Sequence, residues 1–149
     1  MEMKADIKGF DEVKKLLDQL PDKVSRRIAQ SAVTSAARVV QKEVKKAAPR
    51  GTEPSNASRK YGRLRDNIRV IRLRFVKDGQ VAARVDTGSA FWALFIEFGT
   101  RYIAAKPWFS PAFNNAAGAA FDKMRDTLAR RLEKETEKMA SNLGANKKR

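Results

Sequence analysis

The sequence predicts a single α+β domain in which two long helices pack on a small antiparallel β-sheet built around a β-hairpin. Two long segments repeat their apolar residues at helical spacing, and the segment between them changes to the alternation of a strand. The chain has 149 residues, enough for one domain with a modest core and too few for two. We expect the domain to span residues 1–143 and residues 144–149 to form a basic C-terminal tail.

The first third of the chain is expected to be helical after a short edge strand over residues 5–8. Residues 11–20 carry valine and leucine at helical spacing, and Pro21 interrupts this pattern. Residues 22–48 repeat small and aliphatic residues every four positions, which predicts a long amphipathic helix that a neighbour can approach closely. Asp22 is the expected N-cap, and Pro49 ends the helix.

A basic loop and a hairpin are expected next. Residues 50–62 are polar and basic, with almost nothing apolar, which is typical of a loop. Residues 64–76 then alternate, but the apolar positions change parity, so a bulge or a sharp twist is predicted near residues 70–71. The Asp-Gly turn at 78–79 leads into a returning strand that reaches Val85.

The last third begins with an apolar segment and ends with a second long helix. Residues 91–98 are apolar all round, which leaves helix and strand open; we expect a short helix to about Glu97. Ser110 and Pro111 suit the N-cap and first position of a helix that Gly144 closes. Its predicted buried stripe consists of Phe113, Ala117, Phe121, Met124, Leu128, Leu132, Met139 and Leu143.

Charge is concentrated in one part of the chain. The 32 Lys and Arg against 17 Asp and Glu give a net charge of +15, and residues 42–74 alone carry 11 basic and 3 acidic side chains. Such a block attracts DNA phosphates or an acidic protein surface, although a solvated face has the same composition. No base-reading motif accompanies it, so any DNA contact would be independent of sequence. The candidate contacts are Arg50, Arg59, Lys60, Arg63, Arg65 and Arg69.

The residue types exclude several kinds of site. Without cysteine or histidine the chain has no disulfide, no usual zinc site and no histidine base, and we expect neither cofactor nor catalysis. Glu97 is the one carboxylate among the aromatic residues, and we expect Arg101, Lys106 or backbone N–H groups at the Gly99 turn to satisfy it. No apolar run is long enough for a membrane span or a signal peptide, so a cytoplasmic protein is expected.

Residues 91–113 contain both tryptophans and five of the eight phenylalanines. Large apolar residues usually lie in the core, but two helices and a hairpin already fill the interior of a domain this small. The surplus therefore predicts an interface with another protein chain. The candidate interface residues are Trp92, Phe95, Glu97, Phe98, Gly99, Thr100, Lys106, Pro107, Trp108, Phe109 and Pro111.

Two motifs carry a family resemblance. The sequence EFGT at 97–100, followed by KPWFSPA at 106–112, resembles the tail-completion and head–tail joining proteins of long-tailed bacteriophages. Residues 47–50 and 61–68 resemble the helix end and strand entry of the same family, with Trp108 where phenylalanine is common.

The resemblance implies a non-enzymatic virion protein of a phage or prophage. It would be made in the host cytoplasm and would assemble with copies of itself into a ring. The ring would lie at the neck or the head-proximal end of the tail, against adjacent connector and tail proteins. The alternative is a sequence-independent DNA-binding protein that uses the basic hairpin and loop; neither function involves a membrane.

Overall fold

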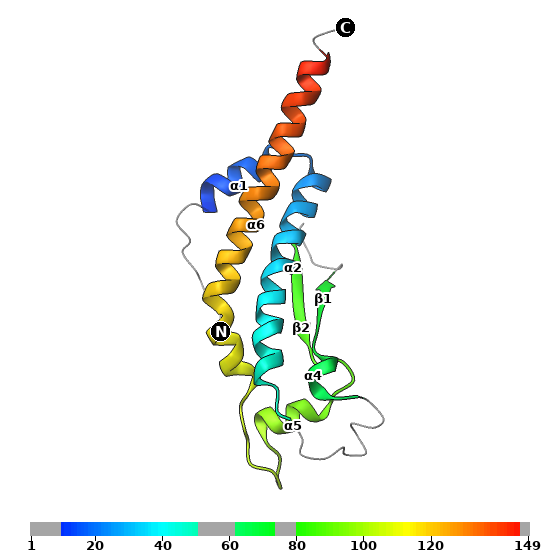
Figure 1. Ribbon diagram of the computed structural model, residues 1–149, viewed down its shortest axis with the longest axis vertical. Helices are drawn as coiled ribbons and strands as arrows, with labels where there is room; N and C mark the ends of the chain where they lie inside the picture. The colour runs from blue at the N-terminus through cyan, green and yellow to red at the C-terminus, as the bar shows by residue number, and fades with distance from the viewer. Residues whose placement is uncertain (1–9, 51–61, 74–79, 147–149) are drawn as a thin grey trace.

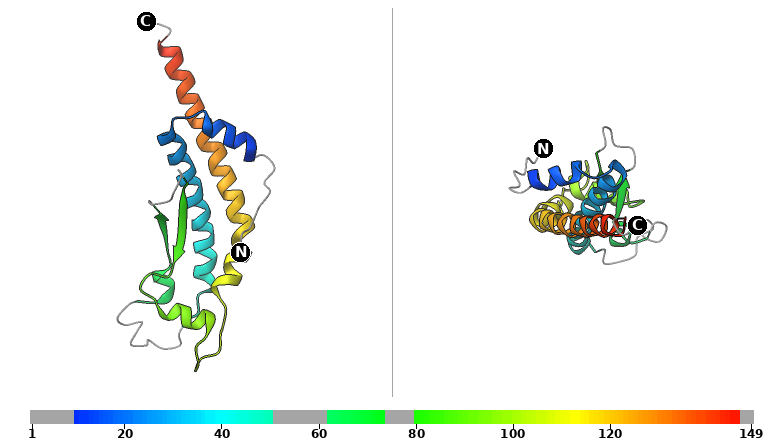
Figure 2. Two further views of the ribbon diagram at one scale, coloured as in Figure 1. Left: turned by 180° about the vertical axis from the view of Figure 1, so that it is seen from behind. Right: turned by 90° about the horizontal axis from the view of Figure 1, so that it is seen from above.

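The computed structural model describes residues 10–50, 62–73 and 80–146. Two long helices, α2 (Asp22–Ala47) and α6 (Phe109–Asn146), run side by side in an elongated molecule (Figure 1). A two-stranded antiparallel sheet packs along α2, and the short helix α1 (Phe10–Asp18) crosses near the opposite end of α2 (Figures 1 and 2). The predicted α+β class, with long helices and a β-hairpin, is confirmed.

Helix α2 forms where the sequence predicts it, but its cap differs from the prediction. The residue at the N-cap position is Pro21, whose carbonyl accepts hydrogen bonds from the N–H groups of Val24 (2.8 Å) and Ser25 (3.0 Å). The predicted cap, Asp22, is instead the first residue of the helix. A negative charge in the first turn still interacts favourably with the positive end of the helix dipole.

The first strand of the hairpin begins later than predicted, and the described paired residues, 69–73 and 82–86, contain no bulge. Strands β1 (Arg69–Leu73) and β2 (Ala82–Asp86) pair in an unbroken register, and residues 64–67 form the one-turn helix α4 (Leu64–Asn67) in place of a strand. The predicted bulge is wrong because Ile68 is fully buried before β1 begins, so the strand does not have to place Ile68 and Val70 on one face. The Ile68 carbonyl accepts a hydrogen bond from the Gln41 side chain (2.9 Å), which ties this corner to α2.

The predicted short helix near Glu97 is confirmed as α5 (Trp92–Phe98). Helix α6 begins at Phe109, one residue before the predicted N-cap Ser110, because a distant side chain caps it. It also continues through Gly144 to Asn146, so the predicted end at Gly144 is wrong. Glycine lowers helix propensity by about 1 kcal/mol relative to alanine without forbidding the helix.

The core consists of two clusters that share α2 and α6. One contains Leu20, Ile28, Ala32, Leu128 and Leu132. The other lies at the α5 end and contains Val40, Val44, Ala48, Leu64, Ile68, Ala90, Ala93, Trp108, Ala112, Ala116 and Ala120.

The buried stripe of α6 corrects the prediction by one position. The early part of the helix buries Ala112, Ala116 and Ala120, whereas Phe113 is exposed. The alanine stripe belongs to the same cluster as Val40 and Val44 of α2, and small side chains on one helix allow the other to approach closely. Met139 and Leu143, which were also expected in the stripe, are exposed.

Some predictions lie outside the described residues. These are the strand over residues 5–8, most of the loop at 50–62, the turn at 78–79 and the last three residues of the basic tail.

Candidate functional site

Glu97 joins α5 to the start of α6. One carboxylate oxygen, Oε2, accepts hydrogen bonds from the backbone N–H groups of Trp108 (2.7 Å) and Phe109 (2.8 Å). The other, Oε1, accepts from the N–H (2.9 Å) and the hydroxyl (2.5 Å) of Ser110. The first N–H groups of a helix have no partner within the helix, so the Glu97 carboxylate acts as the N-cap of α6 from 11 to 13 residues away.

The sequence predicted other partners for Glu97. We expected Arg101, Lys106 or the Gly99 turn, and the three backbone donors belong instead to residues 108–110. Burial would raise the pKa of the Glu97 carboxyl, but the Ser110 hydroxyl and these N–H groups outweigh burial and lower the pKa from 4.5 to about 2. The carboxylate therefore stays charged at neutral pH, with both oxygens engaged, and its task is structural.

The Gly99 turn closes the loop between α5 and α6. Gly99 has φ +74°, and a Cβ atom there would lie 2.7 Å from the Ala105 nitrogen and 2.8 Å from the Ile103 oxygen. Only glycine fits this combination of left-handed backbone and close approach. Beyond the turn, the Thr100 N–H donates to the Ile103 carbonyl (2.8 Å), and the Lys106 N–H donates to the Ile96 carbonyl (2.8 Å). The loop is thus held at its base and near its tip.

Helix α5 presents an apolar face to solvent. Phe91, at its N-cap, and Leu94, Phe95 and Phe98 follow the i, i+3, i+4, i+7 spacing of one helix face, and all four are exposed. Tyr102 and Ile103 at the loop tip extend the exposed surface. We call these six side chains the apolar end face. It lies at one end of the molecule, where α5 and the following loop are found (Figure 1).

The rings on this face support one another. The ring of Phe91 meets those of Trp92 and Phe95 edge to face, with centroids 5.5 and 6.0 Å apart. Edge-to-face packing restricts the rotamers of both partners. A partner that bound here would therefore order few side chains.

The structure separates the predicted interface residues into two groups. Trp108 is buried at 7% exposure in the core, and Trp92 and Phe109 are half-buried against it, so these three residues do not form the outer surface. Phe95 and Phe98 do. Thr100, Lys106, Pro107 and Pro111 are exposed, Gly99 is half-buried and Glu97 is buried.

Four residues of the apolar end face were absent from the prediction: Phe91, Leu94, Tyr102 and Ile103. Helical spacing within residues 91–98 was the signal that could have found the first two.

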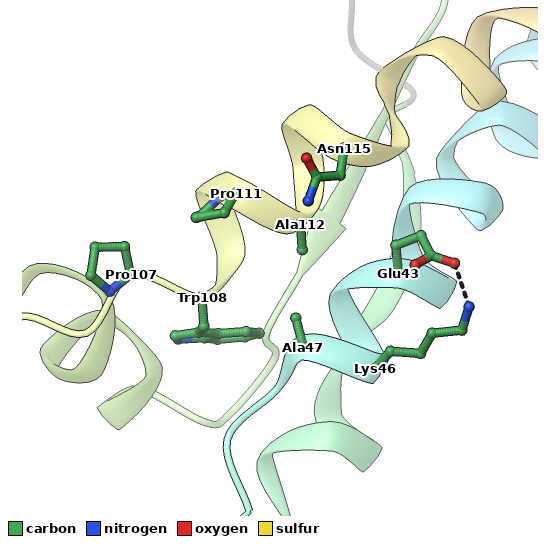
Figure 3. Close-up of a pocket in the computed structure, with 8 residues that line it drawn as sticks. All are labelled: Glu43, Lys46, Ala47, Pro107, Trp108, Pro111, Ala112 and Asn115. Carbon is green, nitrogen blue, oxygen red and sulfur yellow. Dashed lines mark hydrogen bonds and ion pairs between the residues drawn. The ribbon is translucent and has the colours of Figure 1, made fainter.

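A groove of about 470 Å³ lies between the end of α2 and the start of α6, beside Trp108 (Figure 3). The Trp108 ring lies next to Ala47 and Ala112, and the Glu43–Lys46 ion pair (2.6 Å) lies farther along the α2 side. Within the described residues, the buried indole Nε1 of Trp108 has no hydrogen-bond partner. Trp108 thus acts as a space-filling side chain at this junction.

The basic candidates lie around α4 and β1. Arg50, Arg63 and Arg69 are exposed and Arg65 is half-buried, whereas Arg59 and Lys60 lie outside the described residues. Helix α4 lies at the same end of the molecule as α5 (Figure 1). Helix α4 therefore lies at the same end of the molecule as the apolar end face.

Two further kinds of site were searched for. In the described parts of the chain, no three or more acidic, histidine or cysteine residues come together as metal ligands. No helix among the described residues is both long and apolar enough to cross a bilayer.

The fold and this site can be compared with known proteins. The sequence profile of the family described as "Bacteriophage HK97-gp10, putative tail-component" matches residues 11–99. The match therefore includes α1, α2, the hairpin and α5, and ends at the Gly99 turn. Neither a curated protein nor a solved structure matches the sequence. Because the matched range covers more than half of the chain, the protein belongs to the HK97-gp10-like family of bacteriophage tail components.

Proposed function

We propose that this tail component joins the phage head to the tail by assembling as a ring, at the neck or at the head-proximal end of the tail. It acts by protein–protein contact and without catalysis. Its partners are further copies of itself and adjacent connector and tail proteins, and its final location is the virion.

One observation carries the proposal: α5 turns its phenylalanines, Phe95 and Phe98, outward. Phe98, for example, is 72% exposed. The chain is rich in charged residues that could have occupied such a surface position. With about 200 Å² for a fully exposed aromatic side chain, the apolar end face offers on the order of 600–700 Å². That area exceeds most apolar patches on monomers and approaches the roughly 800 Å² that each partner buries in a standard interface.

Glu97 and Gly99 support the same proposal. Their contacts fix α5 and the loop tip to the long helix, so the apolar end face is presented on a rigid base. A rigid surface loses little conformational entropy on binding, which favours assembly.

The test is the mass of the protein in solution as a function of concentration. We expect the wild type to associate beyond a monomer, and the double variant Phe95→Ser/Phe98→Ser to remain monomeric. Phe113→Ser is the matched control, because Phe113 is an exposed phenylalanine on α6. Circular dichroism shows whether each variant keeps its helices. A wild type that remains monomeric up to about 1 mM, where a contact with a Kd of 1 mM is well populated, would overturn self-assembly.

A second function, DNA binding independent of sequence, is favoured by the exposed side chains of Arg63 and Arg69. Its test is binding to random duplex DNA at several salt concentrations. Neutralising both arginines would then reduce the salt dependence of binding. Salt-sensitive DNA binding by a protein that does not self-associate would favour this function over the first.

A further inference from the structure

The C-terminal part of α6 extends beyond the rest of the described molecule (Figure 1, red). Glu135 still contacts another element, through an ion pair with Arg27 of α2 (3.7 Å). Every side chain described after it, over residues 136–143, is exposed. We call residues 136–146 the α6 overhang; at 1.5 Å per residue it is about 16 Å long.

The α6 overhang carries an apolar strip. Met139 and Leu143 lie four residues apart on one helix face, and Leu143 is 73% exposed. In proteins most of the stability of a helix comes from the packing of its apolar face, and the described part of the chain packs nothing on this one. Within the described chain, the last core residues of α6 are Leu128 and Leu132. A second chain packed on Met139 and Leu143 would supply the missing contact.

We infer that the α6 overhang of one copy of this protein packs on the apolar end face of a neighbouring copy. The inference rests on the proposed ring assembly and names the two surfaces that would meet. A ring closes by repeating one contact between two different surfaces of the subunit. The α6 overhang and the apolar end face are different and lie at opposite ends of the molecule (Figures 1 and 2).

Charge favours this pairing over contact between two apolar end faces. The exposed charges of residues 91–107 are Arg101 and Lys106, both positive. Two such faces in contact would bring like charges together, which is costly at an interface. The overhang and its base expose Lys134 and Lys138 as well as Glu133 and Glu137, so this surface is close to neutral and adds no excess of positive charge to Arg101 and Lys106.

Single cysteines can test the contact cleanly, because the natural chain has none. The full-length variants Phe98→Cys and Leu143→Cys are mixed and treated with a short bismaleimide cross-linker. Ser141→Cys is the matched control, because Ser141 is exposed on the opposite face of the same overhang. The measurement is the amount of mixed dimer, distinguished from each homodimer by a mass tag on one variant.

We expect several-fold more mixed dimer from Phe98→Cys with Leu143→Cys than from Phe98→Cys with Ser141→Cys. A second variant, Met139→Glu/Leu143→Glu, should lose self-association while keeping its circular dichroism spectrum. Equal cross-linking at positions 143 and 141, or only homodimers of Phe98→Cys, would overturn the inference.

The failure of this inference differs from the failure of the proposed function. If Met139→Glu/Leu143→Glu still assembles and Phe95→Ser/Phe98→Ser does not, the ring stands and the overhang is not its second surface. If the wild type does not assemble at all, both this inference and the proposed ring assembly are refuted.

Discussion

Replacing Glu97 by glutamine is expected to destabilise the junction between α5 and α6. The substitution keeps the shape of the side chain but removes its charge and replaces one acceptor oxygen with a donor group. The N–H groups of Trp108, Phe109 and Ser110 need acceptors, and a carboxamide cannot accept all the bonds that the carboxylate accepts. Unpaired donors at a buried helix start cost free energy.

The expected magnitude follows from the pKa of Glu97. Its value in the folded protein is about 2, against 4.5 for the ordinary group. At about 1.4 kcal/mol per unit, the folded environment favours the charged form by about 3 kcal/mol. Because the folded pKa is lower than the unfolded pKa, this stabilisation is complete above pH 4.5 and is lost as the pH falls towards 2.

The assay is urea unfolding followed by circular dichroism at a series of pH values. The wild type should exceed Glu97→Gln by about 3 kcal/mol at pH 7, and this difference should shrink steadily between pH 4.5 and 2. Asp122→Asn is the matched control: Asp122 pairs with Arg125 on an exposed helix face (3.2 Å) and should change stability by less than about 1 kcal/mol. A difference at Glu97 that does not depend on pH would refute the reasoning.

Two other predictions concern the same end of the molecule and use the same assay. Gly99→Ala should lower the free energy of unfolding by at least about 2 kcal/mol, since the added Cβ would meet backbone at 2.7 Å in a left-handed turn. Gly118→Ala, in an open position of α6, should instead raise it by about 0.5–1 kcal/mol; equal effects at the two glycines would contradict the role of the turn. Trp108→Ala should cost about 3–5 kcal/mol, and Trp108→Phe should cost less than Trp108→Ala because it leaves a smaller cavity. Phenylalanine keeps an aromatic ring and removes the unpaired indole N–H, so equal losses for both variants would show that ring volume does not determine stability here.

The elements of the fold could be read from the sequence where their signal is local. The apolar period over residues 22–48 and the alternation on either side of the Asp-Gly turn located α2 and the hairpin, within a few residues. The short helix over Trp92–Phe98 was also predicted. The long helix and the hairpin each carry their own periodicity, whereas the short helix was predicted in a segment whose apolar pattern also allowed a strand.

The errors arise where two distant segments determine the outcome together. The predicted buried stripe of α6 runs through Phe113, and the observed one runs through Ala112, one position earlier. The sequence of α6 alone is compatible with both. The close approach of α2 selects the smaller residues. Glu97 was noticed as unusual, but its partners lie beyond the Gly99 turn, and the path of that loop is not visible in a linear pattern.

The sequence predicted an interface from residues 91–113, and the structure exposes only some of the residues that were named for it. Aromatic composition pointed to residues 91–113 without distinguishing rings that fill the core from rings that face solvent. Trp108 fills the junction of α2 and α6, whereas Phe98 lies on the outer face of α5. The aromatic content of a segment does not distinguish a buried ring from an exposed one.

The cap of α6 by Glu97 has a mechanical consequence. The four hydrogen bonds converge on one carboxylate, so a force that pulls α5 away from α6 acts on all four of them together. A load applied to Phe98 would thus reach α6 through the Glu97 carboxylate as well as through the backbone of the loop.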